Sequence, residues 1–315
     1  MKFRTEIDPD AANFELHLGQ TVALIGSCFS DHIGRMLGQH RFEVVPSSHG
    51  ILFHPLAIAG ALESTLDQRV IDGDELYFQD GKHLSLAHHS SFSGTEAEQV
   101  LNHIHAAQKL FLEGLQRSSV LVLTLGTSRG WVWKKTGVVV GNCHKIPAVH
   151  FDRVLTSHAE IVARFEPLFE RIHTDFPLLN IVLTVSPVRH WREGASANQV
   201  SKSHLLIAAD QLAAQFPFVH YFPAYELFMD DLRDYRFYER DMIHPSAEGI
   251  EYVWEKFQGW CMSENSVQAL AQIARLARVG SHIPSAGGES LHQKSIRLAE
   301  EEIRRLIRLS QNEVK

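Results

Sequence analysis

One stretch decides the fold: Thr21-Val22-Ala23-Leu24-Ile25-Gly26-Ser27-Cys28-Phe29-Ser30. Its first five residues, 21–25, form a short continuous apolar run that ends at Gly26. Such a run is typical of a strand that is buried on both faces of a sheet. Residues 31–40 then place Ile33, Met36 and Leu37 on one side of a helix. The stretch therefore predicts a buried strand, a tight turn at the glycine and serine, and a helix.

The same alternation of strand and helix patterns continues along the chain. Further strands are expected at residues 42–46, 119–125, 180–186 and 218–222. Helices are expected at residues 55–66, 96–116, 157–174, 201–215 and 246–260, with a hairpin or irregular excursion at 70–93. Strands that alternate with helices of this length predict parallel β-α-β units and a doubly wound α/β sheet.

Three polar segments follow directly after predicted strands. Gly26-Ser27, Gly126-Thr127 and Ser186-Pro187 each stand just past the carboxyl end of one of them. In an open parallel sheet the ligand crevice lies at that edge, beside the point where the strand order reverses. We therefore expect these segments to meet at one binding crevice.

The composition limits the classes of partner. The 315 residues carry 30 basic and 37 acidic side chains, a net charge of −7, which argues against a nucleic-acid backbone or an anionic membrane. No window approaches the roughly 18 apolar residues that would span a bilayer. The expected partner is a small molecule.

The cysteines and histidines predict neither a disulfide framework nor a metal centre. Cys28, Cys143 and Cys261 are few and far apart, and residues 1–6 have no apolar run behind their charges, so we expect a cytoplasmic protein without a secretory signal. There are 20 histidines, but no H-E-x-x-H or paired C-x-x-C spacing. We expect no metal and no cofactor.

The pattern changes after the helix that ends near residue 260. Residues 263–279 form an amphipathic helical pattern, and residues 280–289 are rich in Gly, Ser and Pro, as in a linker. A last helix follows, with apolar residues at Ile296, Ala299, Ile303 and Leu306. We expect a main domain over 1–262 and a helical extension over 263–315. The last helix would pack on its own domain or form a homo-oligomer with a second copy.

Ser27 and the run Asp241-Met242-Ile243-His244-Pro245-Ser246 together suggest catalysis. Gly-Ser after a strand is commonly turn chemistry or a helix N-cap, and an isolated Asp-x-x-His is commonly a solvated charge beside a cap residue. Paired, they supply a nucleophile, a base and a carboxylate that orients the base. We therefore expect Ser27 as nucleophile, His244 as base and Asp241 as its orienting group.

Both runs resemble the first and last motifs of the SGNH (GDSL-type) esterase and lipase superfamily, and more narrowly the GSCFA-domain family. The resemblance covers about residues 20–260. Its motifs are Gly26-Ser27-Cys28-Phe29, Gly50-Ile51-Leu52 with Pro55-Leu56, Leu125-Gly126-Thr127, Asn142-Cys143-His144-Lys145, Ser186-Pro187-Val188-Arg189-His190, Asn198 with Ser201-Lys202, residues 232–238, and Asp241 to Ser246. It implies a flavodoxin-like three-layer α/β/α sandwich, and hydrolysis or acyl transfer through a serine triad.

Departures from the superfamily pattern affect the oxyanion hole. No Asp separates Gly26 from Ser27, and no Asn follows Gly126. The N–H groups of Ser27 and Gly50, with Asn142, are expected to hold the oxyanion. By chain order Gly50 matches the superfamily's oxyanion glycine, although it could simply serve a bend. Asn142 is the candidate side-chain donor, although it could be a turn residue, and Thr127 or Ser128 could donate instead.

The crevice-side loops offer binding candidates. Thr127, Arg189 and His190 could contact the substrate, and the aromatic and basic residues near them could hold an anionic or sugar-like group. Alternatively, Arg233, Asp234 and Arg236 form an ion-pair network that braces the Asp241 loop. A thiol mechanism is disfavoured because Cys28 and Cys143 have the character of small buried apolar groups.

Three functions remain open from the residues. The first is a serine esterase that hydrolyses a small acyl ester, such as an acetylated carbohydrate. The second is an O-acyltransferase that uses the same triad. The third is a ligand-binding protein that kept the crevice without catalysis.

Overall fold

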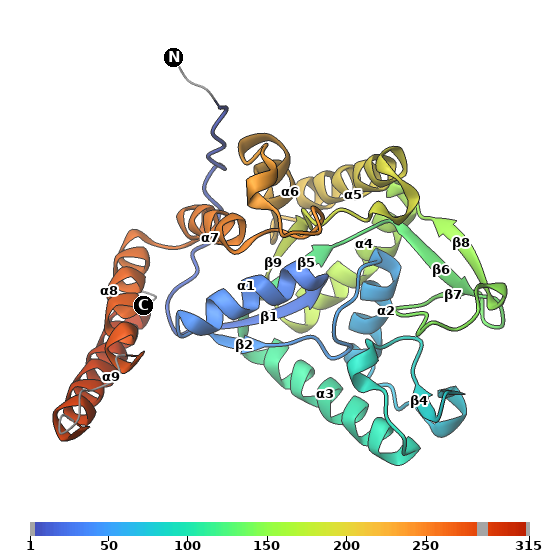
Figure 1. Ribbon diagram of the computed structural model, residues 1–315, viewed down its shortest axis with the longest axis horizontal. Helices are drawn as coiled ribbons and strands as arrows, with labels where there is room; N and C mark the ends of the chain where they lie inside the picture. The colour runs from blue at the N-terminus through green and yellow to red at the C-terminus, as the bar shows by residue number, and fades with distance from the viewer. Residues whose placement is uncertain (1–3, 282–288, 313–315) are drawn as a thin grey trace.

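The computed structural model describes residues 4–281 and 289–312, and at its centre lies a parallel sheet in the order β10-β9-β5-β1-β2 (Figure 1). Every neighbouring pair in this sheet runs parallel. Its strands are β1 Thr21–Gly26, β2 Glu43–Val45, β5 Ser118–Leu125, β9 Asn180–Val185 and β10 Val219–Phe222. The order reverses at β1, because the chain goes from β1 to β2 on one side and returns to β5 on the other. This is the flavodoxin-like order, so the predicted α/β fold is confirmed.

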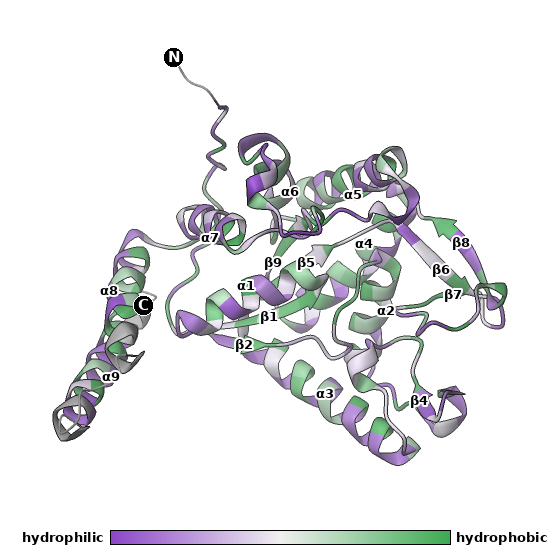
Figure 2. Cartoon of the chain, viewed as in Figure 1, coloured by the Kyte–Doolittle hydropathy of each residue, from purple (hydrophilic) through white to green (hydrophobic). Residues whose placement is uncertain are grey.

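Side chains along each strand alternate between two apolar cores, one on each face of the sheet. In β1, Ala23 and Ile25 belong to one core, and Val22 and Leu24 belong to the other. The first core is covered by α2 Pro55–Leu66, α3 Ala97–Arg117, α4 His158–Asp175 and α5 Ala195–Gln215. The second is covered by α1 Cys28–Gln39 and α7 Ala247–Cys261. Figure 2 shows the strands of the sheet as largely hydrophobic, in keeping with a layer buried on both faces.

A second, antiparallel sheet was not predicted from the sequence. It has the order β7-β6-β8 and consists of β6 Arg129–Trp133, β7 Val138–Val139 and β8 Phe151–Leu155. Trp133, Val140, Ile146 and Phe151 form its own small core. The excursion expected over 70–93 contains the antiparallel hairpin β3 Tyr77–Gln79 and β4 Lys82–Leu84. Both units extend from the carboxyl side of the main sheet (Figure 1).

The chain ends in two long helices, α8 Glu264–Ser281 and α9 Glu289–Asn312. Both contribute to the core beside α1 and α7, through Ile273 and Ile303 among others. Ser310 Oγ accepts a hydrogen bond from the Leu18 backbone N–H at 3.2 Å, so α9 is tied to the segment that leads into β1. The predicted boundary falls at Met262, between α7 and α8, and of the predicted linker, residues 282–288 lie outside the described residues. Packing of α9 on a second copy stays a prediction.

Within residues 4–281 and 289–312, no helix combines the length and the apolar character that crossing a membrane requires.

Candidate functional site

Ser27 lies at the turn between β1 and α1, at the carboxyl edge of the sheet. Gly26 permits this turn, because its φ is +140° and a Cβ there would come within 2.3 Å of the Thr124 carbonyl oxygen. Ser27 is the N-cap residue of α1, but its side chain makes no capping hydrogen bond. Within the described part of the chain, its Oγ is buried without a hydrogen-bond partner. The hydroxyl therefore does not serve the ordinary capping role.

Asp241 and His244 form a hydrogen-bonded pair on one short loop. Asp241 Oδ2 lies 2.6 Å from His244 Nδ1, and Asp241 Oδ1 accepts the backbone N–H groups of Ile243 at 2.8 Å and His244 at 3.0 Å. The His244 backbone, the His244 ring and the Ile243 backbone, in that order, lower the pKa of Asp241 to about 2. The carboxylate is therefore ionised at neutral pH. An imidazole that donates to it through Nδ1 keeps Nε2 as an acceptor, which is the tautomer a general base needs.

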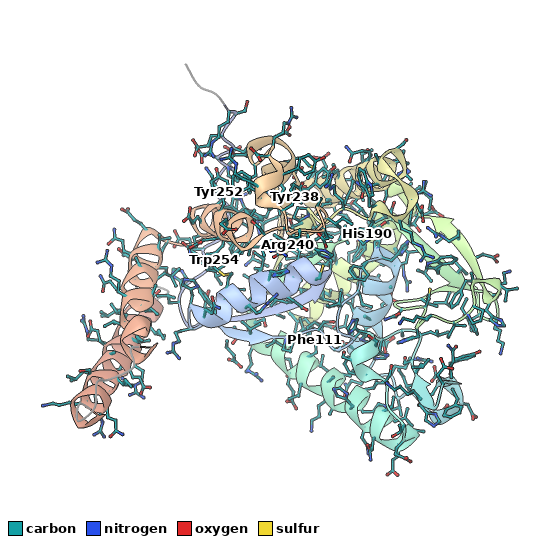
Figure 3. The ribbon with its side chains drawn as sticks, in the orientation of Figure 1. Phe111, His190, Tyr238, Arg240, Tyr252 and Trp254 are labelled. Carbon is teal, nitrogen blue, oxygen red and sulfur yellow. The ribbon has the colours of Figure 1, made fainter. Side chains whose placement is uncertain are left out.

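The loop lies against the segment that follows β9, because Arg189 of that segment donates hydrogen bonds to the carbonyls of Met242 and Ile243. The pKa of His32, on the first turns of α1, is lowered by burial, by Arg35 and by His244. The pKa of His190, after β9, is lowered to about 3 by burial, by Lys202 and by His244. Figure 3 labels Tyr238 and Arg240, which precede Asp241 in the chain, and His190, which follows β9. Ser27 Oγ and His244 thus lie at the same edge of the sheet, but no hydrogen bond joins them among the described residues.

Arg189 contacts the loop through both its backbone and its side chain. Its backbone N–H donates to the Ile243 carbonyl at 3.4 Å, and its guanidinium donates to the Met242 carbonyl. The guanidinium carbon also lies 4.8 Å from the ring centroids of both Trp191 and Tyr238. Met242 has a φ of +58°, so Arg189 holds a backbone segment that is strained. Arg189 therefore braces the loop.

The residues considered as alternative braces pair locally. Arg233 bonds Asp230 at 2.8 Å, and Arg236 bonds Asp234 at 2.8 Å. All four side chains are largely exposed. Within the described structure, neither ion pair includes Asp241 or His244.

The expected oxyanion residues lie in two neighbouring segments, and some of their donors are already engaged. The Ser27 N–H donates to the Thr124 carbonyl at 3.1 Å, and the Gly50 N–H donates to the Ser47 carbonyl at 3.3 Å. Gly50 has a φ of +71° and stands next to Ile51, which bridges to Gly26. The Gly50 backbone therefore lies close to the turn that carries Ser27.

Asn142 has a side chain that is only partly used. Its Oδ1 accepts the His144 backbone N–H at 2.9 Å, and its own backbone N–H donates to the Leu86 carbonyl at 3.1 Å. No protein acceptor for its Nδ2 is found in the described residues. A turn role and a free amide donor are thus both present in this one side chain.

Thr127 and His190 line a common pocket on the β9 side of Ser27. Thr127 Oγ1 bonds Ser201 Oγ at 2.9 Å, and the His190 backbone N–H donates to Asn198 Oδ1 at 2.9 Å. The His190 ring packs edge-on against Phe53 with centroids 5.5 Å apart, and its buried Nε2 has no partner among the described atoms. With its pKa lowered to about 3, chiefly by burial, the His190 ring is neutral.

Lys202 is a central residue that the sequence pattern did not single out for a role. It is completely buried, and its ammonium donates to the Gly126 carbonyl at 2.7 Å and to the Ser186 carbonyl at 2.5 Å. It therefore ties together the carboxyl ends of β5 and β9. Burial lowers the pKa of Lys202 to about 7. The sequence did contain a sign that Lys202 is buried. Asn198, Lys202 and Leu205 follow helical spacing, which places the lysine on the inward side of α5.

Burial raises the pKa values of two of the cysteines. Burial, followed by Asp31, raises the pKa of Cys28, and burial raises the pKa of Cys143 to about 11, so both thiols stay protonated at neutral pH. Across residues 4–281 and 289–312, no group of three or more His, Cys, Asp or Glu side chains is arranged to hold a metal ion.

Comparison with known proteins gives one family and several distant structures. Residues 21–257 match the model of the GSCFA family. A protein provisionally assigned as a platelet activating factor from Streptococcus pneumonia aligns with TM-score 0.41 and 14% identity, over 76% of this chain and 83% of that one.

A family two carbohydrate esterase from Clostridium thermocellum aligns with TM-score 0.37 and 9% identity, over 77% of this chain. An acetyl xylan esterase from Butyrivibrio proteoclasticus aligns with TM-score 0.38 and 10% identity, over 76% of this chain. The alignments span 63% of each of those two chains. No curated protein matches the sequence significantly.

Proposed function

The chain belongs to the GSCFA family, and from this premise and the state of Ser27 we propose that it is a serine-dependent acyl hydrolase. The observation that carries the proposal is the Ser27 hydroxyl, which is buried at a helix N-cap, makes no capping bond and has no partner among the described residues. An unpaired buried hydroxyl costs free energy, roughly 1–3 kcal/mol, so its retention calls for an explanation. A nucleophile that awaits its substrate and its base supplies one for Ser27, which, unlike the equally unpaired Ser30, stands at the turn between β1 and α1.

In the proposed reaction His244 Nε2 accepts the proton of Ser27 as Oγ attacks the acyl carbonyl carbon. Asp241 holds the His244 ring through Nδ1 and stabilises the imidazolium that forms. The tetrahedral intermediate collapses when His244 returns the proton to the leaving alcohol. Water then repeats the sequence on the acyl-enzyme, which releases the acid and restores Ser27.

The oxyanion of the intermediate would be held by the Gly50 N–H and by Asn142 Nδ2. The Gly50 donor must first leave the Ser47 carbonyl, a bond of 3.3 Å at the weak end of the range. The Ser27 N–H is a poorer candidate, because it completes the pairing of β1 with β5 at Thr124. Loss of one oxyanion donor generally costs about 2.7–4 kcal/mol in the barrier.

Reaction with a fluorophosphonate probe tests the nucleophile directly. We expect one adduct, mapped by peptide mass spectrometry to Ser27, and a loss of both labelling and ester turnover by roughly 10⁴-fold or more in Ser27→Ala. Ser30→Ala is the matched control, because Ser30 is also a buried serine of the same helix with an unpaired hydroxyl. It should keep both activities.

Two outcomes would contradict the proposal. An adduct on another residue would remove Ser27 from the nucleophile role. A folded chain that neither reacts with the probe nor hydrolyses any member of a panel of acyl esters would instead be a binding protein.

We further propose that the acyl group is small, as in an acetylated carbohydrate, and that water is the acceptor. Transfer to a sugar hydroxyl would use the same triad. Turnover of 4-nitrophenyl acetate with and without added sugars distinguishes the two, because a transferase forms an acetylated sugar and a hydrolase forms only acetate.

A further inference from the structure

A pocket of about 140 Å³ lies next to Thr127 and His190 and is lined by three arginines. Arg129 starts β6, Arg153 lies on β8, and Arg192 belongs to the turn between β9 and α5. One carboxylate, that of Glu193, lines the same pocket. The small sheet thus brings together cations that are distant in the sequence.

The positive charge of this pocket is only partly neutralised. Arg129 Nε lies 3.1 Å from Glu193, and the Arg153 guanidinium pairs with the other oxygen of the same carboxylate. Arg192 has no ion-pair or hydrogen-bond partner within the described residues. Three guanidiniums and one carboxylate leave a local excess of two positive charges, in a chain whose net charge is −7.

The arginines are also close enough to repel one another. The pKa of Arg153 is lowered by burial, then by the charges of Arg192 and Arg129. Glu193 already lies between Arg129 and Arg153, so Arg192 is the cation of this pocket that lacks a counter-ion among the described residues. The positive charge that Glu193 does not neutralise therefore points to an anionic ligand in this pocket.

The geometry of the cluster is fixed before any ligand arrives. The Arg153 guanidinium lies 4.2 Å from the ring centroid of Trp131, its cross-strand partner in the small sheet. Arg129 uses Nε for Glu193 and for the Ala197 carbonyl, so its terminal nitrogens have no protein partner in the described residues. Planar guanidinium groups held in this way suit the paired oxygens of a carboxylate or phosphate.

The pocket lies at the same edge of the sheet as the proposed nucleophile. Thr127 comes two residues after β5, and β5 is the neighbour of β1, the strand that Ser27 follows. Neighbouring strands lie about 4.8 Å apart, so a small molecule can extend from one strand end to the next. His190 lines the pocket and also interacts electrostatically with His244.

We infer that the substrate of this site carries an anionic group, a carboxylate or a phosphate, that Arg129, Arg153 and Arg192 bind on the β9 side of Ser27. This inference rests on the proposed function for the role of the group, but the binding itself does not require turnover. The acyl ester would then be held at Ser27 while its anionic group fills the arginine pocket.

Calorimetric titration of the Ser27→Ala chain at constant ionic strength tests the binding apart from catalysis. The probes are D-galacturonate, inorganic phosphate, and D-galactose as the uncharged match of the first. We expect at least one anion to bind about 10-fold or more tightly than D-galactose, and the stronger of the two identifies the group. Arg192→Gln should weaken that binding about 10-fold.

Arg297→Gln on α9 is the control, because it also removes an exposed guanidinium but lies outside the pocket. It should leave anion binding unchanged. The inference is overturned if neither anion binds better than D-galactose, or if Arg297→Gln weakens binding as much as Arg192→Gln does. If the anions bind as expected but no probe labels Ser27, the pocket stands and the hydrolase proposal fails.

Discussion

Asp241 uses both of its carboxylate oxygens, and each has a different task. Oδ1 fixes the loop by accepting two backbone N–H groups, and Oδ2 accepts from the His244 ring. An amide in place of the carboxylate can keep only part of this arrangement. Its nitrogen cannot accept a hydrogen bond, so either the loop or the imidazole loses its partner.

We therefore predict that Asp241→Asn lowers kcat for ester hydrolysis by about 10³–10⁴-fold, because the His244 tautomer is no longer fixed. Asp234→Asn is the comparison, since Asp234 is an exposed acid on the same segment that pairs with Arg236. It should lower kcat less than twofold. Steady-state kinetics on a chromogenic acetyl ester gives both values, and equal losses in the two variants would refute the orienting role of Asp241.

At the scale of single residues, the sequence indicated which side chains could be catalytic, but it did not indicate which residues they contact in the fold. Ser27, Asp241 and His244 were proposed because each stands at a strand end or helix start that local patterns reveal. The bracing role of Arg189 was missed, because its contact with the Met242 carbonyl joins residues 53 apart in the sequence. Substrate binding by Arg189 stays a prediction, and the folded chain adds that its guanidinium contacts the loop.

Among the elements, β5 and β9 end side by side, and Lys202 on α5 binds the carbonyls at both ends. Replacing Lys202 with Met removes the ammonium and leaves two buried carbonyls without this donor.

The stability that Lys202 contributes depends on pH, and the sign follows from its pKa, which is about 7 in the folded chain and about 10.4 in the unfolded chain. Between these values the unfolded chain binds more protons, so stability rises with pH.

We predict that the free energy of unfolding of the natural chain, relative to Lys202→Met, increases by about 2 kcal/mol between pH 7 and pH 9. Urea unfolding of the two proteins at both pH values measures it. If the difference between them stays constant, the buried amine does not titrate in this range.

The strands of the main sheet were predictable because buried parallel strands have continuous apolar runs. The small sheet was not predictable in the same way. Arg129–Trp133 and Phe151–Leu155 mix charged and aromatic residues, and β7 has only two residues. Its existence depends on cross-strand pairs such as Trp131 with Arg153, and no local pattern reports such a pair.

At the scale of the whole molecule, α8 and α9 extend the core beyond the sheet. Ile303 on α9 is only 4% exposed and shares its core with α1, α7 and residues before β1. The amphipathic pattern of this helix was visible in the sequence. The face on which it packs was left open between its own chain and a second copy.

Ile303→Ala should lower the free energy of unfolding by about 2–4 kcal/mol, because it leaves a cavity in the shared core. Leu298→Ala is the matched control on the same helix, because Leu298 is 56% exposed. It should cost less than about 0.5 kcal/mol. Chemical denaturation followed by tryptophan fluorescence checks both values. An equal and small effect of the two substitutions would mean that α9 contributes little to the stability of the fold.

The burial of Ser27, only 1% exposed, has a kinetic consequence. A reagent cannot reach Oγ until neighbouring side chains move, so under the proposed function every turnover would include an opening step. The apparent affinity for any reagent falls by the fraction of molecules that are open. At high reagent concentration the labelling rate should therefore stop rising and equal the opening rate, which depends on solvent viscosity and not on the leaving group.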